Sequence, residues 1–155
     1  MPFTYPYARP AVTADVVLFA MRAGELVVLL IRRRHEPFEG AWALPGGFVD
    51  ENEPLETAAL RELEEETGVK GVAVEQLGAF GEPGRDPRGH TVSVAYVGFP
   101  GEEVPTVTAG DDAAEAQWYP VDSLPEKLAF DHRSIVTLAQ QRWAEAQRRR
   151  RDPAR

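Results

Sequence analysis

Runs of aliphatic and β-branched residues, separated by turn residues, predict most of the strands. AVTADVVLFA over residues 11–20 and LVVLLIRR over residues 26–33 have the composition of two strands. The same composition predicts strands over residues 71–80 and 91–99, and a last strand that begins at Glu115. Such stretches, bounded by glycine and proline clusters, are typical of strands. The second run is the most continuously apolar, which indicates a largely buried strand.

Two other stretches have the apolar spacing of amphipathic helices. In the first, Pro54 suits the first helical turn and Gly68 supplies the stop. Between them lies a stripe of small or apolar residues that suits burial against a sheet: Ala59, Leu60, Leu63 and Thr67. The second helix is expected over residues 131–151, with Asp131 as its N-cap. Its apolar positions recur at helical spacing: Ile135, Leu138, Ala139 and Trp143.

Another face of the first helix concentrates acid. Glu62, Glu65 and Glu66 share one narrow arc, because each helical residue turns the chain by roughly 100°. Like charges so placed repel by roughly a few tenths of a kcal/mol per pair. Arg61 is the only basic residue between Glu53 and Glu66. Such a run is commonly a solvated acidic face. The alternative is a site for a hard divalent cation such as Mg²⁺, which prefers oxygen ligands.

The order of the residues favours the metal site. The stretch over residues 47–69 runs Gly47, five residues, Glu53, seven residues, Arg61-Glu62-Leu63, one residue, Glu65-Glu66, one residue and Gly68-Val69. It resembles the Nudix hydrolase signature, with every required position filled. The resemblance implies a loop-helix-loop that binds divalent metal and cleaves a nucleoside diphosphate linked to another group. It also implies the fold: one α/β (α+β) domain over residues 1–155, an α/β/α sandwich with a mixed central sheet.

The resemblance also implies roles for individual residues. Glu62, Glu65 and Glu66 would hold one or more Mg²⁺ or Mn²⁺ ions, joined by the carbonyl of Gly46. The corner Pro45-Gly46-Gly47 is expected to need glycine for backbone conformations that other residues resist. Arg61 would orient a carboxylate by ion pairing, and Glu53 would brace the loop.

The group that activates the attacking water stays open at this point. In related hydrolases an acidic residue outside the signature often serves as a general base or an extra metal ligand. Asp111, Asp112 and Glu115 compete for that role, and Glu53 is a further candidate. For each of them a solvated or capping residue is the alternative interpretation.

Two loops are candidates for substrate binding. The RHEPFEG loop that follows Arg33 commonly lies beside the substrate in this family, so Arg33 is a candidate phosphate contact and Phe38 a candidate base-stacking contact. A solvated strand end and simple packing are the alternatives. The GEPGRDPRGH loop over residues 81–90 offers Arg85 and Arg88 to a pyrophosphate or a terminal ribose phosphate. Its alternative is a solvated turn.

The run from RDPRGH through TVSVAYVGF, with YARPAVTADVVLF near the start, resembles the ADP-ribose pyrophosphatase subset of the family. This resemblance implies metal-dependent hydrolysis of ADP-ribose to AMP and ribose 5-phosphate. A housecleaning hydrolase of nucleoside triphosphates, including 8-oxo-dGTP, is the alternative enzyme. A non-catalytic nucleotide sensor is the alternative outside the enzymes.

The composition of the chain limits the kinds of partner that it is expected to bind. The 155 residues with 43% apolar content suit one domain, and no window of about 18 apolar residues exists to span a membrane. A net charge of −8 argues against nucleic-acid and membrane partners, whereas a bound metal would admit a small phosphorylated substrate. Zero cysteines exclude disulfides and thiolate metal sites. The arginines at 148–151 are interpreted as a solvated helix end.

The start of the chain, MPFTYPYARP, lacks the pattern of a signal peptide, so a cytoplasmic location is expected. Its prolines disfavour regular strand pairing. This aromatic arm over residues 1–10 is expected to lie over the sheet or over the partner subunit of a homodimer.

Overall fold

The computed structural model describes residues 2–110 and 113–152, and its elements follow the predicted alternation of strands and helices. The strands are β1 (Ala11–Arg22), β2 (Glu25–Arg33), β3 (Trp42–Ala43), β4 (Gly46–Phe48), β5 (Glu75–Phe80), β6 (Thr91–Gly98) and β7 (Ala113–Pro120). The helices are α1 (Leu55–Thr67), the short 3-10 helix η1 (Val121–Ser123) and α2 (His132–Arg151).

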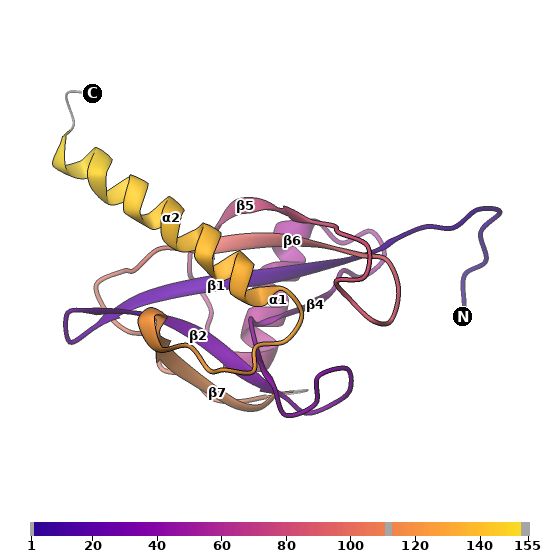
Figure 1. Ribbon diagram of the computed structural model, residues 1–155, viewed down its shortest axis with the longest axis horizontal. Helices are drawn as coiled ribbons and strands as arrows, with labels where there is room; N and C mark the ends of the chain where they lie inside the picture. Colours follow the sequence, from indigo (N-terminus) through magenta and orange to yellow (C-terminus); the bar gives the residue numbers. More distant parts are fainter. Residues whose placement is uncertain (1, 111–112, 153–155) are drawn as a thin grey trace.

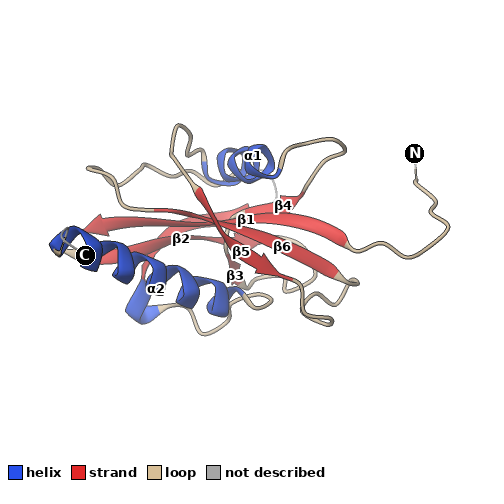
Figure 2. Ribbon diagram, turned by 90° about the horizontal axis from the view of Figure 1, so that it is seen from above, coloured by secondary structure: helices blue, strands red, loops and turns tan. Residues whose placement is uncertain are grey.

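The seven strands form one mixed sheet. Its path runs β3-β2-β1-β6-β5, with β4 paired to β1 and β7 paired to β2. β1 is parallel to β6 and antiparallel to β2 and β4. Figure 1 shows the N-terminal arm and the free end of α2 leaving the body on opposite sides, and Figure 2 shows α1 and α2 on opposite faces of the sheet. The expected α/β/α sandwich with a mixed central sheet is confirmed.

The core lies in two layers because β1 and β2 are apolar on both faces. Successive side chains of a strand point to opposite faces, so Val17 and Phe19 pack on the α2 side while Val16 and Leu18 pack on the α1 side. α1 contributes Ala58, Ala59 and Leu63, and α2 contributes Ile135, Val136 and Ala139. The largely buried second strand predicted from the sequence is confirmed.

Several boundaries differ from the prediction. β5 begins at Glu75 instead of residue 71, because Gly71 has φ +75° and turns the backbone out of the extended region. β7 begins two residues earlier than Glu115, at Ala113, and β1 continues to Arg22. Leu138, predicted on the buried stripe of α2, is instead exposed.

The helix ends follow the prediction in part. Gly68 ends α1 with φ +75°, and its N–H donates to the carbonyl of Glu64 at 2.8 Å. Pro54 takes the position before the helix, with ψ 145°, instead of a place in the first turn. Asp131 precedes α2 without forming a side-chain cap. Its carboxylate is bound to Arg85 instead.

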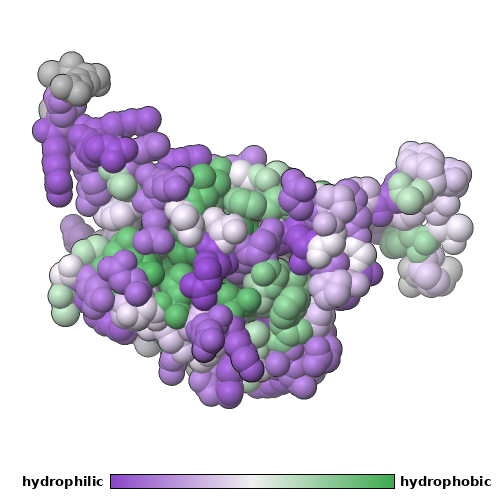
Figure 3. Space-filling view, viewed as in Figure 1, coloured by the Kyte–Doolittle hydropathy of each residue, from purple (hydrophilic) through white to green (hydrophobic). Residues whose placement is uncertain are grey.

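The free end of α2 is a hydrophilic surface, as Figure 3 shows, and carries Arg148–Arg151 in its last turn. Within the part of the chain that the structure describes, no helix combines the length and the apolar run needed to cross a bilayer.

The pairing of β4 with β1 positions the candidate site. Asp15 lies opposite Gly46, and Thr13 lies opposite Phe48. α1 follows β4 after a short loop and packs against β1. The glycine corner and the acidic helix therefore meet the middle of the sheet.

Candidate functional site

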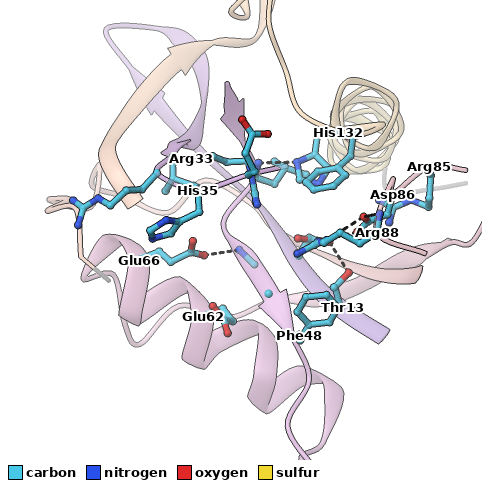
Figure 4. Close-up of a pocket in the computed structure, with 18 of the residues that line it drawn as sticks. Thr13, Arg33, His35, Phe48, Glu62, Glu66, Arg85, Asp86, Arg88 and His132 are labelled. Atoms are coloured by element: carbon cyan, nitrogen blue, oxygen red, sulfur yellow. Dashed lines mark hydrogen bonds and ion pairs between the residues drawn. The ribbon is translucent and has the colours of Figure 1, made fainter. Parts of the chain in front are cut away.

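A pocket of about 380 Å³ lies where β1, β4 and α1 meet the loop over residues 81–90 and the start of α2. Figure 4 shows Glu62 and Glu66 projecting from α1 on one side, with Arg85, Asp86 and Arg88 on the opposite side. The polar side chains of its lining are Thr13, Asp15, Arg33, Arg34, His35, Glu36, Asp50, Glu62, Glu66, Arg85, Asp86, Arg88 and His132. Acidic and basic groups thus face each other across one cavity.

The glycine corner makes room for carboxylates. A side chain on Gly46 would overlap Asp15 Oδ1 and come within 2.5 Å of the Ala14 carbonyl. A Cβ on Gly47 would lie 2.7 Å from the carboxyl carbon of Glu62. Neither glycine has a positive φ, so the sequence prediction that this corner needs glycine for its backbone conformation is wrong. The two glycines are needed for space.

Glu66 is the most deeply placed carboxylate of α1 in this pocket. It is 6% exposed, and its Oε1 accepts the N–H of Gly46 at 2.7 Å. Burial raises the pKa of Glu66 to about 8, and the charges of Glu62 and Asp15 raise it further against the Gly46 hydrogen bond. Burial also raises the pKa of Glu62, although Arg61 opposes that rise. The corner therefore gathers carboxylate oxygens with little compensating charge.

This donor set fits a hard divalent cation. Mg²⁺ commonly takes one or two protein carboxylates, keeps several waters and binds substrate phosphates. Glu62 and Glu66 supply two such carboxylates at the pocket wall. Over residues 2–110 and 113–152, no three His, Cys, Asp or Glu side chains are already spaced as a metal cage. An ion would therefore rely on water and substrate oxygens for part of its shell.

Arg61 lies outside the pocket lining and holds the acidic residues around it. Its Nε donates to Glu53 at 2.7 Å, and its Nη1 donates to Glu62 at 2.9 Å and to Glu65 at 3.1 Å. Glu65, with 41% of its side chain exposed, likewise does not line the pocket. Hydrogen bonds from Arg61 and then from the Asp50 N–H lower the pKa of Glu53 to about 2. A carboxylate this acidic is a weak acceptor for a water proton at neutral pH.

Arg33 and Arg88 bring positive charge to the opposite side. Their guanidinium carbons lie 5.2 and 5.8 Å from the ring centre of Phe130. Burial lowers the pKa of Arg33, and the charge of Arg88 lowers it further. Arg88 also lies 4.8 Å over the ring of Phe48 and forms a two-pronged pair with Asp86 at 2.8 and 3.1 Å. The pocket therefore holds two cations that repel each other, as an anion-binding site does.

Arg85 and Phe38 occupy structural positions. The guanidinium of Arg85 donates two hydrogen bonds to Asp131, at 2.6 and 3.0 Å, and its side chain is only 5% exposed. This pair ties the loop over residues 81–90 to the start of α2. Phe38 packs edge-on against Phe130 with ring centres 4.8 Å apart and does not line the pocket. The Phe38 contact is the packing alternative. Arg85 lines the pocket but is far less exposed than Arg88, whose side chain is 41% exposed.

Of the proposed acids outside the signature, the structure describes Glu115. Glu115 pairs with Arg32 at 2.5 Å across β2 and β7 and does not line the cavity. Asp111 and Asp112 lie outside the described residues.

Sequence reasoning missed several buried polar groups of the pocket, among them Asp15 and His132. Asp15 interrupts the apolar run of β1, which was an available signal for a polar role. His132 Nδ1 accepts the Leu44 N–H at 2.9 Å, a contact between residues 88 positions apart that no local pattern reveals. His35, Phe48 and Asp86 also line the cavity without having been predicted.

Comparison with known families gives one match to most of the chain. A family model described as NUDIX domain matches residues 9–139. The ADP-ribose pyrophosphatase of Methanocaldococcus jannaschii is 43% identical over 131 residues, which cover 84% of this chain and 73% of that protein. The ADPR responsive transcriptional repressor NtrR of Acinetobacter baylyi is 34% identical over 139 residues, which cover 86% of this chain. The chain spans only 54% of that repressor's length.

Solved structures agree in fold. A MutT/nudix family protein from Enterococcus faecalis superposes with a TM-score of 0.83 at 40% identity, covering 93% of this chain and 66% of that one. The NUDIX domain of Shewanella oneidensis NrtR, solved in complex with ADP ribose, superposes with a TM-score of 0.83 at 35% identity. That match covers 90% of this chain and 94% of that domain.

Proposed function

The chain belongs to the family of NUDIX domains, and on this premise we propose that it is a pyrophosphohydrolase that converts ADP-ribose and water to AMP and ribose 5-phosphate. The similarity to an archaeal ADP-ribose pyrophosphatase and to a NUDIX domain solved with ADP ribose supports this substrate. The whole proposal rests on one further observation, the opposition of carboxylates and arginines across a single pocket.

A diphosphate fits between these two sides. Its oxygens carry negative charge that repels an attacking water, so the charge must be neutralised before phosphorus can be attacked. Arg33 and Arg88 would bind those oxygens from one side, because their guanidinium groups share the Phe130 ring and already repel each other. Arg88 is held in place by Asp86 and Phe48, which reduces the entropy lost when it binds.

The carboxylate side would hold the metal. Glu62 and Glu66 are the proposed first ligands, with Glu65 and the Gly46 carbonyl as further candidates, and Mg²⁺ or Mn²⁺ as the ion. When bound, such an ion neutralises phosphoryl oxygens and lowers the pKa of a coordinated water. Arg61 would keep Glu62 in position, and Glu53 would hold Arg61. In the reaction, oxygen from water bonds to one phosphorus, and the bridging P–O bond breaks.

Assembly and location are finer parts of the proposal. Phe3, Tyr5 and Tyr7 are exposed on the arm that leaves the body in Figure 1. An exposed aromatic arm of this kind suits a partner subunit, so we propose a homodimer. The cytoplasmic location rests on the sequence argument alone.

The test is a hydrolysis screen with product identification. ADP-ribose, dGTP and 8-oxo-dGTP are compared at matched concentration in EDTA, Mg²⁺ and Mn²⁺, with AMP and ribose 5-phosphate identified by mass. We expect AMP release from ADP-ribose that needs a divalent ion. Faster hydrolysis of 8-oxo-dGTP would point to housecleaning. ADP-ribose binding without turnover in any metal would point to a sensor.

A pair of variants on α1 tests the assigned ligand. Glu66→Gln should remove most turnover while the circular dichroism spectrum stays unchanged. Glu64→Gln is the matched control, because Glu64 is exposed on the same helix outside the pocket. Near-normal rates for Glu66→Gln would refute the ligand assignment.

A further inference from the structure

Asp15 is a buried carboxylate in the pocket to which the proposed reaction assigns no role. It is 6% exposed and lies in the middle of β1, opposite Gly46 of β4 and Ala95 of β6. A charged side chain at such a position is costly to bury without partners. Its place among the residues that line the cavity indicates a role toward a ligand.

The two oxygens of Asp15 differ in their surroundings. The hydroxyls of Ser93 and Thr13 both donate to Oδ2, the second at 3.4 Å. Oδ1 lies against the Cα of Gly46, at the point where any side chain would overlap it. The hydroxyls hold one oxygen of the carboxylate, and the absence of a side chain on Gly46 leaves room for the other oxygen of this pocket-lining residue.

The charge of Asp15 determines which groups can approach it. The two hydroxyls donate to this carboxylate, and its charge interacts with that of Glu66 and with those of Arg33 and Arg85. A phosphate placed against Oδ1 would meet the negative charge of Asp15 itself, with that of Glu66 close by. A sugar hydroxyl can donate to Oδ1, and hydrogen bonds to charged groups are the stronger ones.

We propose that Asp15 is a specificity-determining residue that accepts a hydrogen bond from a ribose hydroxyl of a nucleoside diphosphate ribose and disfavours a phosphate at the same place. The inference rests on the proposed function and deepens it. An ADP-ribose molecule has a distal ribose on the side of its diphosphate where a nucleoside triphosphate has its third phosphate, and the ribose hydroxyl assigned to Asp15 is one of that distal ribose. Asp15 therefore favours the first substrate class over the second.

The direct test compares substrates in the full-length protein with Mg²⁺. For Asp15→Asn we expect kcat/KM on ADP-ribose to fall about 10- to 100-fold, the usual effect of losing a hydrogen bond to a charged group. The value on ATP should stay the same or rise, so the ADP-ribose to ATP ratio falls at least tenfold. Asp122→Asn, an exposed carboxylate, is the matched control.

Two results would overturn the proposal. Equal losses on ADP-ribose and ATP would make Asp15 a structural residue. Weaker Mn²⁺ binding by Asp15→Asn in the absence of nucleotide, measured by electron paramagnetic resonance, would make it a metal ligand. Failure of the wild-type protein to cleave ADP-ribose is a separate result, which refutes the proposed function itself.

A measurement on the wild-type protein covers the case in which Asp15→Asn does not fold. Analogues of ADP-ribose that lack single ribose hydroxyls are compared with the parent compound. We expect an analogue that lacks one hydroxyl of the distal ribose to lose about 10- to 100-fold in kcat/KM, and a loss confined to the adenosine ribose would contradict the proposed specificity. Equal rates for all the analogues would overturn the proposal.

Discussion

Lowering the pH is expected to weaken the fold through His132. This side chain is 3% exposed, and its Nδ1 accepts the N–H of Leu44, which requires an unprotonated nitrogen. Burial lowers the pKa of His132 by more than the carboxylates of Asp15 and Asp131 raise it. The folded protein therefore keeps the imidazole neutral at pH values where the unfolded chain binds a proton.

The sign and size of the effect follow from proton binding. Because the folded pKa is lowered, this contribution to stability is complete above the ordinary value of 6.5 and is lost as the pH falls below it. If the folded state stays unprotonated, acidification from about pH 7.5 to about pH 5.0 costs about 2 kcal/mol. For a domain of this size, this change lowers the Tm by roughly 4–8 °C.

The assay is urea unfolding of metal-free protein across this pH range at constant ionic strength, followed by circular dichroism. His132→Asn places an amide oxygen where Nδ1 lies, so it keeps an acceptor for Leu44 and removes the titration. The wild type should lose more stability than this variant on acidification, by up to about 2 kcal/mol. His90→Asn, at an exposed histidine, should behave as the wild type does. Parallel curves for wild type and His132→Asn would refute the reasoning.

Three further predictions follow from the pocket and its frame. Without metal at pH 8, Glu66→Gln should unfold at a higher urea concentration than the wild type, because the substitution removes a buried carboxylate whose charge is poorly compensated. Added Mg²⁺ should stabilise only the wild type. Gly46→Ala should lower the free energy of unfolding by about 3 kcal/mol or more, because the new side chain would overlap Asp15. Gly101→Ala, which has open space around it, should change that free energy by less than about 1 kcal/mol in the same assay. Arg85→Ala should lower the free energy of unfolding by about 3 kcal/mol, because it breaks the largely buried ion pair with Asp131. Arg88→Lys should keep the fold and raise the KM for ADP-ribose about tenfold.

Most of the fold could be predicted because its signals are local. The apolar runs of β1 and β2 and the spacing in α1 each depend on residues a few positions apart. The errors occur where a more distant contact decides. Residues 71–74 have strand composition, but this segment pairs with β6 only from Glu75 onward. Asp131 has the residue type of an N-cap, but its carboxylate is taken by an arginine 46 positions away.

The candidate site was predictable only where it is contiguous in sequence. Glu62 and Glu66 come from one helix, so their shared face follows from helix geometry. Arg85 and Arg88 lie in the same loop with the same chemistry, and only their partners separate them. Asp131 engages the first, while Asp86 and two aromatic rings hold the second beside the cavity. No local pattern contains that difference.

The two glycines of the corner were predicted to be important, but for a different physical reason from the one that the structure shows. A glycine pair after proline suggests unusual backbone angles, yet Gly46 and Gly47 adopt angles open to other residues. What the corner lacks is side-chain volume, and the two vacated positions are filled by the carboxylates of Asp15 and Glu62. The Gly46 N–H then binds Glu66, so the corner brings together one acid of the sheet and two of the helix. Burial and mutual repulsion make this cluster of carboxylates unfavourable in the free protein. A cation that binds there relieves the repulsion, so the electrostatic strain stored in the fold adds to the affinity for the cation and its substrate.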